Sequence, residues 1–165
     1  MSASRNDKLR CCRGFTLIEL LITLTILGLL ASLALPVSRT VIQRAHEQEL
    51  RHALREIRDA IDMYKRAVDD GKIQKSALDS GYPKELRDLA IGITDQTDAK
   101  KRKLYFLRRV PRDPMNPDLT LAPEDSWGKR CLDSEPDDPQ EGADVFDVYS
   151  RSVTVGLNGS PYNQW

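Results

Sequence analysis

Hydrophobic and polar positions divide the chain into two parts with different patterns. From Phe15 to Leu35 the residues are apolar or small, apart from a few hydroxyl side chains and one carboxylate, Glu19. About twenty helical residues at about 1.5 Å each span about 30 Å, the thickness of a membrane's hydrocarbon core. The pattern predicts a transmembrane helix over residues 15–35. A carboxylate inside such a segment is costly and usually marks a function.

A second, amphipathic pattern begins beyond Pro36. Apolar residues recur there at spacings of four and three, which is typical of one face of an α-helix. They are Leu50, Leu54, Ile57, Ile61, Tyr64 and Val68. We expect one long helix over residues 15–71, kinked or loosened near Pro36 and stopped at Gly71. The stripe is short for a coiled coil, so we expect it to pack on a small domain of the same chain.

Charged residues occupy the other faces of this helix. Three pairs of opposite charge have the i,i+4 spacing of helical ion pairs, namely Glu47–Arg51, Arg55–Asp59 and Asp62–Arg66. Such pairs stabilise a helix by a few tenths of a kcal/mol each. The pattern predicts that all three form on the solvent side.

Residues 72–165 have the pattern of a small domain. Tyr82-Pro83 and the leucines after it predict a turn that leads into a short helix. Three strands are predicted, over residues 127–132, 145–149 and 153–155. An acidic, proline-containing loop separates the first two. The predicted fold class is therefore α+β: a long amino-terminal helix packed on a small antiparallel sheet with a carboxy-terminal loop.

Composition restricts the classes of function. The 165 residues include 25 acidic and 25 basic side chains, so no overall positive field favours nucleic acid. The sequence contains no nucleophile–histidine pair, phosphate-binding glycine loop or paired-cysteine motif, and we expect neither an enzyme nor a catalytic cofactor. His46 and His52 lie on the charged helix without ligand-spaced neighbours. Cys131 is the only cysteine after residue 12, so we expect no internal disulfide in that part.

The junction at Gly14 is the most informative stretch. A basic leader ends at this glycine, and the apolar segment starts on the next residue. A secretory signal peptide fits poorly, because its apolar region is usually about 7–15 residues long. A plain membrane anchor, with Glu19 solvated at the membrane surface, does not explain why the basic leader ends at a glycine. The run Gly14-Phe15-Thr16-Leu17-Ile18-Glu19 instead resembles the cleavage motif of type IV pilins and of the pseudopilins of type II secretion.

This resemblance implies how the junction is used. In that family a membrane-embedded prepilin peptidase cuts after the glycine, here Gly14, and methylates the new amino terminus, here Phe15. Residues 1–14 would be a leader that is removed, and residues 72–165 a periplasmic domain. Glu19 would pair with the Phe15 amine of a neighbouring subunit, since opposite charges offset much of the cost of burying each other in a low-dielectric layer.

The second half resembles the major, G-type pseudopilin. Tyr82-Pro83, the turn Pro111-Arg112-Asp113-Pro114 and Trp127-Gly128 occur in that family's order. One difference is that the family's aspartate-proline-tryptophan-glycine run is interrupted here, because Met115 follows Pro114 and Trp127-Gly128 comes later. The resemblance implies a type IV pilin-like fold.

The resemblance also implies a calcium site in the carboxy-terminal loop, with aspartates among its ligands. Residues 150–165 contain no carboxylate side chain, although Asp144 and Asp147 lie just upstream. Calcium prefers several hard oxygen ligands, and anionic ones raise its affinity. We therefore expect weak calcium binding or none, and a loop closed by the packing of Tyr162 and Trp165.

The function implied is that of a pseudopilin subunit. It would polymerise into the periplasmic pseudopilus of a type II secretion system and drive export of folded proteins across the outer membrane. The expected location is the inner membrane, as a single-pass protein, and a periplasmic filament after assembly. The expected partners are further copies of itself in a helical homopolymer, minor pseudopilins, the prepilin peptidase, an inner-membrane assembly platform and membrane lipid.

Two alternatives stay open at this point. One is a type IV pilin or minor pilin that serves adhesion, motility or DNA uptake, which the single cysteine disfavours because many such proteins close their carboxy-terminal loop with a disulfide. The other is a membrane-anchored periplasmic binding domain that never polymerises. An intact Met1 would indicate the anchor, and a methylated Phe15 the filament subunit.

Overall fold

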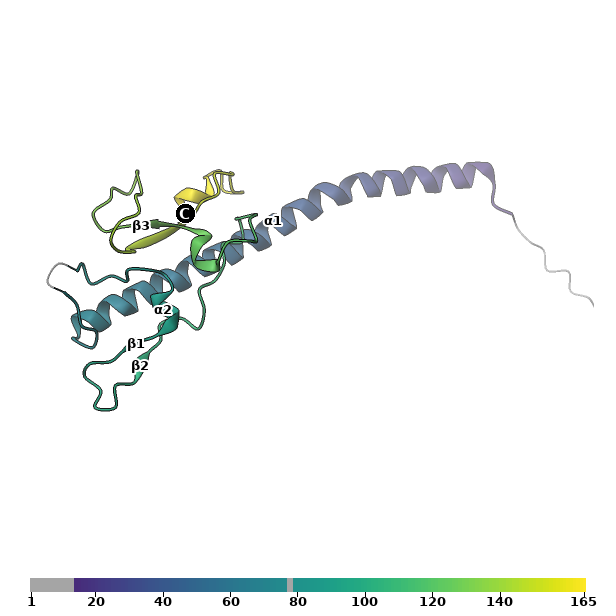
Figure 1. Ribbon diagram of the computed structural model, residues 1–165. Helices are drawn as coiled ribbons and strands as arrows, with labels where there is room; N and C mark the ends of the chain where they lie inside the picture. Colours follow the sequence, from purple (N-terminus) through teal and green to yellow (C-terminus); the bar gives the residue numbers. More distant parts are fainter. Residues whose placement is uncertain (1–13, 77–78) are drawn as a thin grey trace, which may run out of the picture. The chain divides into compact units, whose positions relative to one another are not determined.

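The computed structural model describes residues 14–76 and 79–165, without the side chains of residues 33–39. The chain divides into two compact units, one ending at Val41 and one running from Ile42 to Trp165. Helix α1 (Leu17–Asp69) begins in the first unit and ends in the second (Figure 1). The predicted leader up to residue 13 and the side chain of Pro36 lie outside the described residues.

The first unit is the apolar start of α1. Every side chain from Phe15 to Ser32 is exposed. Thr16 caps the helix, because its hydroxyl oxygen accepts the N–H of Glu19 at 3.2 Å. Within the part of the chain described here, no helix is both long and apolar enough to cross a membrane. The span over residues 15–35 stays a prediction.

The second unit contains the rest of α1 and several short elements. The structure describes one further α-helix, α2 (Asp88–Ile91), and two antiparallel pairs of strands. One pair joins β1 (Ile93–Thr94) to β2 (Lys103–Leu104), and the other joins β3 (Trp127–Arg130) to β4 (Asp147–Ser150). Two 3-10 turns complete it, η1 (Pro123–Asp125) and η2 (Tyr162–Gln164). The α+β, pilin-like fold class is confirmed.

The predicted apolar stripe of α1 forms the core of this unit. Leu50, Leu54, Ile57 and Ile61 are at most 3 % exposed. They share one cluster of buried residues with side chains of α2, β3 and β4, namely Leu89, Trp127 and Val148. Burying a large aliphatic side chain completely stabilises a fold by roughly 1.5–3 kcal/mol, so this stripe fixes α1 on the small domain.

Gly128 has a steric role in the pairing of β3 with β4. It lies directly opposite Tyr149 in the register of the two strands. A Cβ atom at position 128 would overlap the Tyr149 ring. The glycine after Trp127 therefore leaves room for an aromatic ring to cross the sheet.

The third predicted strand is wrong. Residues 153–155 form no strand, and their only pairing is an isolated bridge between Val155 and Pro161. The turn between these two residues closes on itself, because the N–H of Gly156 donates to the carbonyl of Ser160 at 2.9 Å. The segment therefore bonds within its own loop and adds no strand to β4.

The three predicted i,i+4 ion pairs are also wrong. Glu47 turns into the core, as described below. Arg55, Asp59, Asp62 and Arg66 form no ion pair with any residue that the structure describes. Exposed pairs contribute little beyond the side-chain entropy that they lose, so sequence spacing alone does not ensure that they form.

Candidate functional site

The junction residues lie together where α1 begins. Residues 14–16 precede the helix in a non-helical conformation. Apart from the neighbouring residues in the chain, no described atom lies within 4 Å of the position that a Cβ on Gly14 would take, and Phe15 is 81 % exposed. The carboxylate of Glu19 is exposed and has no hydrogen-bond or ion-pair partner among the described residues. The residues on either side of the Gly14–Phe15 bond are therefore exposed, and a carboxylate without a described partner lies four residues after Phe15.

A second carboxylate on α1, that of Glu47, is buried and hydrogen-bonded. The side chain of Glu47 is buried, with 6 % of the residue exposed. Its Oε1 accepts the main-chain N–H of Leu157 at 2.7 Å, the hydroxyl of Tyr162 at 2.9 Å and Nε2 of Gln43 at 3.3 Å. Burial raises the pKa of Tyr162, so this hydroxyl stays protonated and donates. Glu47 therefore fastens the carboxy-terminal loop (residues 150–165) to the helix.

Sequence reasoning placed Glu47 on the solvent side and missed this role. A signal was present, because Glu47 precedes Leu50 by three positions and so continues the apolar stripe by one turn. A carboxylate at a core position predicts a buried acid with tertiary donors. Helical spacing to Arg51 was the weaker indication.

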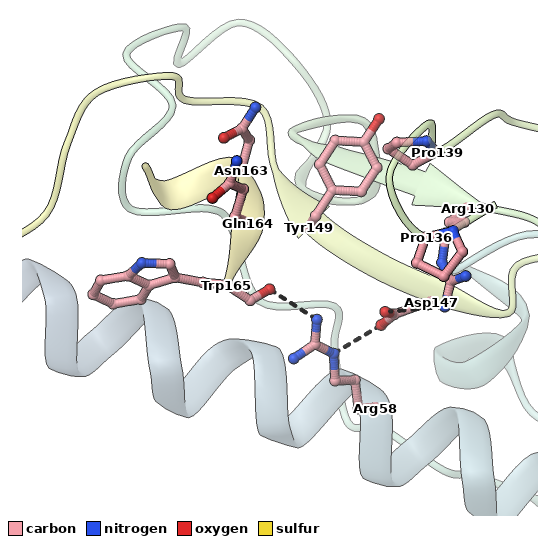
Figure 2. Close-up of a pocket in the computed structure, with 9 residues that line it drawn as sticks. All are labelled: Arg58, Arg130, Pro136, Pro139, Asp147, Tyr149, Asn163, Gln164 and Trp165. Carbon is pink, nitrogen blue, oxygen red and sulfur yellow. Dashed lines mark hydrogen bonds and ion pairs between the residues drawn. The ribbon is translucent and has the colours of Figure 1, made fainter. Parts of the chain in front are cut away.

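Arg58 provides the second attachment of the loop. Its Nε donates to Oδ1 of Asp147 on β4 at 2.7 Å. Its Nη2 donates to the main-chain oxygen of Trp165 at 3.0 Å (Figure 2). The same nitrogen donates to the main-chain oxygen of Val148 at 3.1 Å. One guanidinium thus joins α1, β4 and the end of the loop.

A cavity of about 330 Å³ lies beside this arginine (Figure 2). Its charged lining residues already pair with each other, since Asp147 contacts both Arg58 and Arg130, the latter at 3.7 Å. The rest of its lining comes from the acidic loop, β4 and the carboxy-terminal loop. The cavity therefore presents no unpaired charge to a ligand.

Aromatic contacts complete the closure of the carboxy-terminal loop. The rings of Tyr162 and Trp165 meet edge to face with 5.0 Å between centroids. The guanidinium of Arg51 lies 4.3 Å from the centroid of the Trp165 ring, and the indole N–H donates to Ser160 Oγ at 2.8 Å. The prediction that Tyr162 and Trp165 close the loop by packing is confirmed.

A buried aspartate connects the proline-fixed turn to the sheet. Asp113 is fully buried, and its Oδ2 accepts the hydroxyl of Ser150 at 2.7 Å. Its own N–H donates to Ser126 Oγ at 3.0 Å, and the Trp127 indole donates to the carbonyl of Pro111 at 2.8 Å. Burial raises the pKa of the Asp113 carboxyl. The chain between Pro114 and Trp127 loops back, so residues separated in sequence lie together in space.

The donor set does not fit calcium. Asp147 pairs with arginines, and Asp144 accepts the main-chain N–H of Leu132 at 3.0 Å. Among the residues that the structure describes, no group of three or more histidine, cysteine, aspartate or glutamate side chains could hold a metal ion. Fastening of the loop is instead achieved by protein donors and acceptors.

An exposed apolar helix behind a glycine–aromatic junction, continued into a small α+β domain, defines a pilin-like subunit. Residues 9–35 match the family model described as the prokaryotic N-terminal methylation motif. No solved structure matches the chain.

Similarity to curated relatives identifies the family within this class of pilin-like subunits. The chain is 31 % identical over 121 residues to the type II secretion system core protein G of Pectobacterium carotovorum subsp. carotovorum, covering 71 % of this chain and 70 % of the relative. It is 30 % identical to the protein of that name from Aeromonas hydrophila, covering 79 % and 87 %. The Klebsiella michiganensis protein is 29 % identical, with 80 % and 88 % covered. The chain belongs to the type II secretion system core protein G family and is a major pseudopilin.

Proposed function

We propose that this pseudopilin is cut after Gly14 by a prepilin peptidase and assembles with further copies of itself into a pseudopilus. Residues 15–35 anchor the chain in the inner membrane, and residues 72–165 lie in the periplasm. The filament drives export of folded proteins across the outer membrane. The observation that carries this proposal is the exposed Gly14–Phe15 junction at the head of an apolar helix whose described side chains, from Phe15 to Ser32, are all exposed.

The role of Glu19 follows from electrostatics. Cutting after Gly14 creates a cationic amine on Phe15, four residues before Glu19 and just ahead of the first turn of α1. A lone carboxylate in a low-dielectric layer is costly, and an opposite charge offsets much of that cost. Pairing between Glu19 of one subunit and the amine of its neighbour therefore selects one register of assembly. Apolar helices gain little from leaving lipid, so packing and this pair specify their association.

The role is structural, with no catalytic step assigned to the chain. Its partners are further copies of itself, minor pseudopilins, the peptidase and an inner-membrane assembly platform. Membrane lipid surrounds the apolar segment before assembly. The type IV pilin alternative lacks the support that the named secretion relatives give to the pseudopilin.

Mass spectrometry of the amino terminus tests the processing step. The full chain is expressed with and without a prepilin peptidase, and the expected product with the enzyme starts at N-methylated Phe15. Glu19→Leu is expected to be cut but to assemble poorly, whereas Glu19→Asp retains partial assembly because it keeps the charge. An intact Met1 in the presence of active peptidase would support the non-polymerising anchor.

A further inference from the structure

A further cavity of the second unit lies between α1 and the carboxy-terminal loop. It measures about 300 Å³ and shares Arg58 and Trp165 with the cavity of Figure 2. Three of its lining residues are arginines and the others are uncharged, namely Arg51, Leu54, Arg55, Arg58, Asn158 and Trp165. Spacings of four and three place the arginines on one side of α1. Among the described residues, no carboxylate side chain lines this cavity, which we name the arginine pocket.

Two of the three guanidinium groups are held in place by the fold. That of Arg51 lies 4.3 Å from the centroid of the Trp165 ring. Arg58 donates three hydrogen bonds, to β4 and to the end of the carboxy-terminal loop. An arginine has five N–H donors, so two of those of Arg58 remain available. Groups that are already held in position lose less entropy when a ligand binds.

The third arginine, Arg55, has no partner in the described part of the chain. It is exposed and forms no hydrogen bond, ion pair or ring contact there. The nearest exposed acids on this side of α1 are Asp59 and Asp62, and neither lines the pocket or pairs with a described residue. Asn158 adds a polar group, because its Oδ1 accepts the N–H of Ser160 at 3.1 Å and its amide nitrogen is left as a donor. The pocket therefore presents donors and positive charge without an acceptor of its own.

We propose that the arginine pocket binds a carboxylate-bearing segment of another protein. Planar guanidinium groups match carboxylates in a bidentate geometry, and clusters of arginines are a recurring means of recognising acidic motifs. Ligand pockets usually measure about 300–1,000 Å³, so this one is large enough for one or two acidic side chains but small for a cofactor. The inference goes beyond assembly, because it requires neither cleavage nor polymerisation.

Two other sources of negative charge are less suitable. One is the acidic loop of the same chain, residues 133–144. Pro136 and Pro139 of this loop line the adjoining cavity, yet its acids form no ion pair with the arginines of the pocket. The other is a lipid phosphate. Arg51 follows Leu35, the last residue of the predicted membrane segment, by sixteen residues, which is about 24 Å of helical rise.

Binding of a labelled acidic peptide to the full-length chain in detergent tests the proposal. The probe is fluorescein-labelled hexaglutamate, and fluorescence anisotropy gives its Kd. One variant carries Arg51→Gln and Arg55→Gln, and a second carries Arg55→Gln alone, which removes no contact within the described fold. The matched control is Arg108→Gln with Arg109→Gln. It removes the same charge from two exposed arginines that form no ion pair with a described residue and lie outside the pocket.

The two-site variant is expected to bind hexaglutamate at least about tenfold more weakly, and Arg55→Gln at least about threefold, because charge-assisted hydrogen bonds are lost. The control should stay within about twofold of the unchanged chain, since its arginines do not contact the peptide. Binding should weaken as salt is added, and labelled hexaglutamine should not bind. Circular dichroism of each variant shows whether it is folded.

Four outcomes would overturn the proposal. In the first, the unchanged chain does not bind the peptide or the pocket variants bind it equally well, so the arginines are only solvated. In the second, the control loses as much affinity as the two-site variant, which indicates attraction to any basic surface. In the third, micromolar inorganic phosphate displaces the peptide, which makes the site one for phosphate. In the fourth, the two-site variant loses sedimentable filament and Asp137→Asn with Asp138→Asn reproduces the loss, which identifies the occupant as a second copy of this chain.

The proposed function fails by a different measurement. An unchanged chain that is neither cut nor polymerised would reject assembly, while the affinity for hexaglutamate and its dependence on Arg55 would stand.

Discussion

The two units of this pseudopilin differ in whether their apolar side chains are exposed or buried. In the first, Leu17 is 78 % exposed and Leu29 is 66 % exposed on a helix that is apolar on every side. In the second, α1 hides one apolar stripe and also buries a carboxylate. A helix that is hydrophobic on every face is normally buried, either in a bilayer or among neighbouring helices. The first unit is therefore specified by what lies outside the chain, and the second by contacts within it.

Two glutamates on the same helix show the difference most clearly. Glu19 is exposed and its carboxylate has no partner among the described residues. Glu47 is buried and receives hydrogen bonds from Leu157, Tyr162 and Gln43. Ionised acceptors form the stronger hydrogen bonds, and leaving their buried donors unpaired is costly. One acid is available for a partner, and the other is already committed to the fold.

The largest effect is expected from the amino-terminal junction. Gly14→Val places a branched side chain where the proposed protease must bind the backbone, and we expect the processed form to fall by tenfold or more, to about background. Filament should be lost with it. The measurement is the mass of the membrane-extracted protein after co-expression with the peptidase.

Gly28→Ala is the control for this variant. It adds a Cβ at the other glycine of the first unit, where no described atom lies within 4 Å of the new carbon apart from the adjoining residues and the backbone of the helix itself. Normal processing of this variant, with loss of processing in Gly14→Val, assigns the effect to the junction. Equal processing of both variants contradicts the role given to Gly14.

The next effect is expected at Glu47. Glu47→Ala leaves the N–H of Leu157 and the hydroxyl of Tyr162 without their acceptor, each at a cost of about 1–3 kcal/mol. We expect the free energy of unfolding to fall by about 2–4 kcal/mol and hydrogen exchange to rise at Leu157. Denaturant unfolding of detergent-solubilised full chain measures the first quantity. Glu49→Ala, an exposed neighbour, should change it by less than about 0.5 kcal/mol.

Periodicity predicted much of this architecture. The stripe from Leu50 to Ile61 and the pairing of β3 with β4 follow from spacing and strand propensity, because burial on one face imposes a period on the sequence. Glu47 was misplaced because charge was given more weight than position in the stripe. Its partners, Leu157 and Tyr162, are over one hundred residues away. No local pattern encodes such a contact.

The path by which the chain returns to contact Asp113 was equally difficult to predict from the sequence. The interruption after Pro114 suggested a departure from the G-type pattern, yet Ser126 and Trp127 come back to contact Asp113 and Pro111. A loop's length is visible in the sequence, but the path that closes it depends on packing. The junction is different, since Gly14, Phe15 and Glu19 lie within six consecutive residues and the pattern that they form is local.

The pH dependence of stability provides a subtler test of the second unit. Burial raises the folded-state pKa of Asp113 above its usual value of 3.8. The stabilisation that this causes is therefore present below that value and is lost as the pH rises through the folded-state pKa. The difference in melting temperature between the unchanged protein and Asp113→Asn should be larger near about pH 3.5 than near about pH 7.

Asp118→Asn is the matched comparison, with the opposite sign. A hydrogen bond from the Thr120 hydroxyl lowers the pKa of Asp118, which is exposed. Its contribution is present above the unfolded value and is lost as the pH falls, so its difference in melting temperature should grow with pH. The same trend in both variants would mean that burial does not govern Asp113.

The smallest effect is expected from calcium, and it tests whether the second unit is complete in itself. A bound ion at a hundred times its Kd would add about 2.7 kcal/mol to the free energy of unfolding. Because Glu47 and Arg58 already fasten the carboxy-terminal loop, and because Asp147 is committed to two arginines, we expect calcium or a chelator to move the melting temperature by less than about 1 °C. Calcium should shift the melting temperature of Glu47→Ala equally little, since removing a carboxylate oxygen cannot create a calcium site. A rise of several degrees in the unchanged chain, abolished by Asp144→Asn, would show that the loop completes itself with an ion, and the contrast between the two units would then rest on a metal rather than on protein contacts alone.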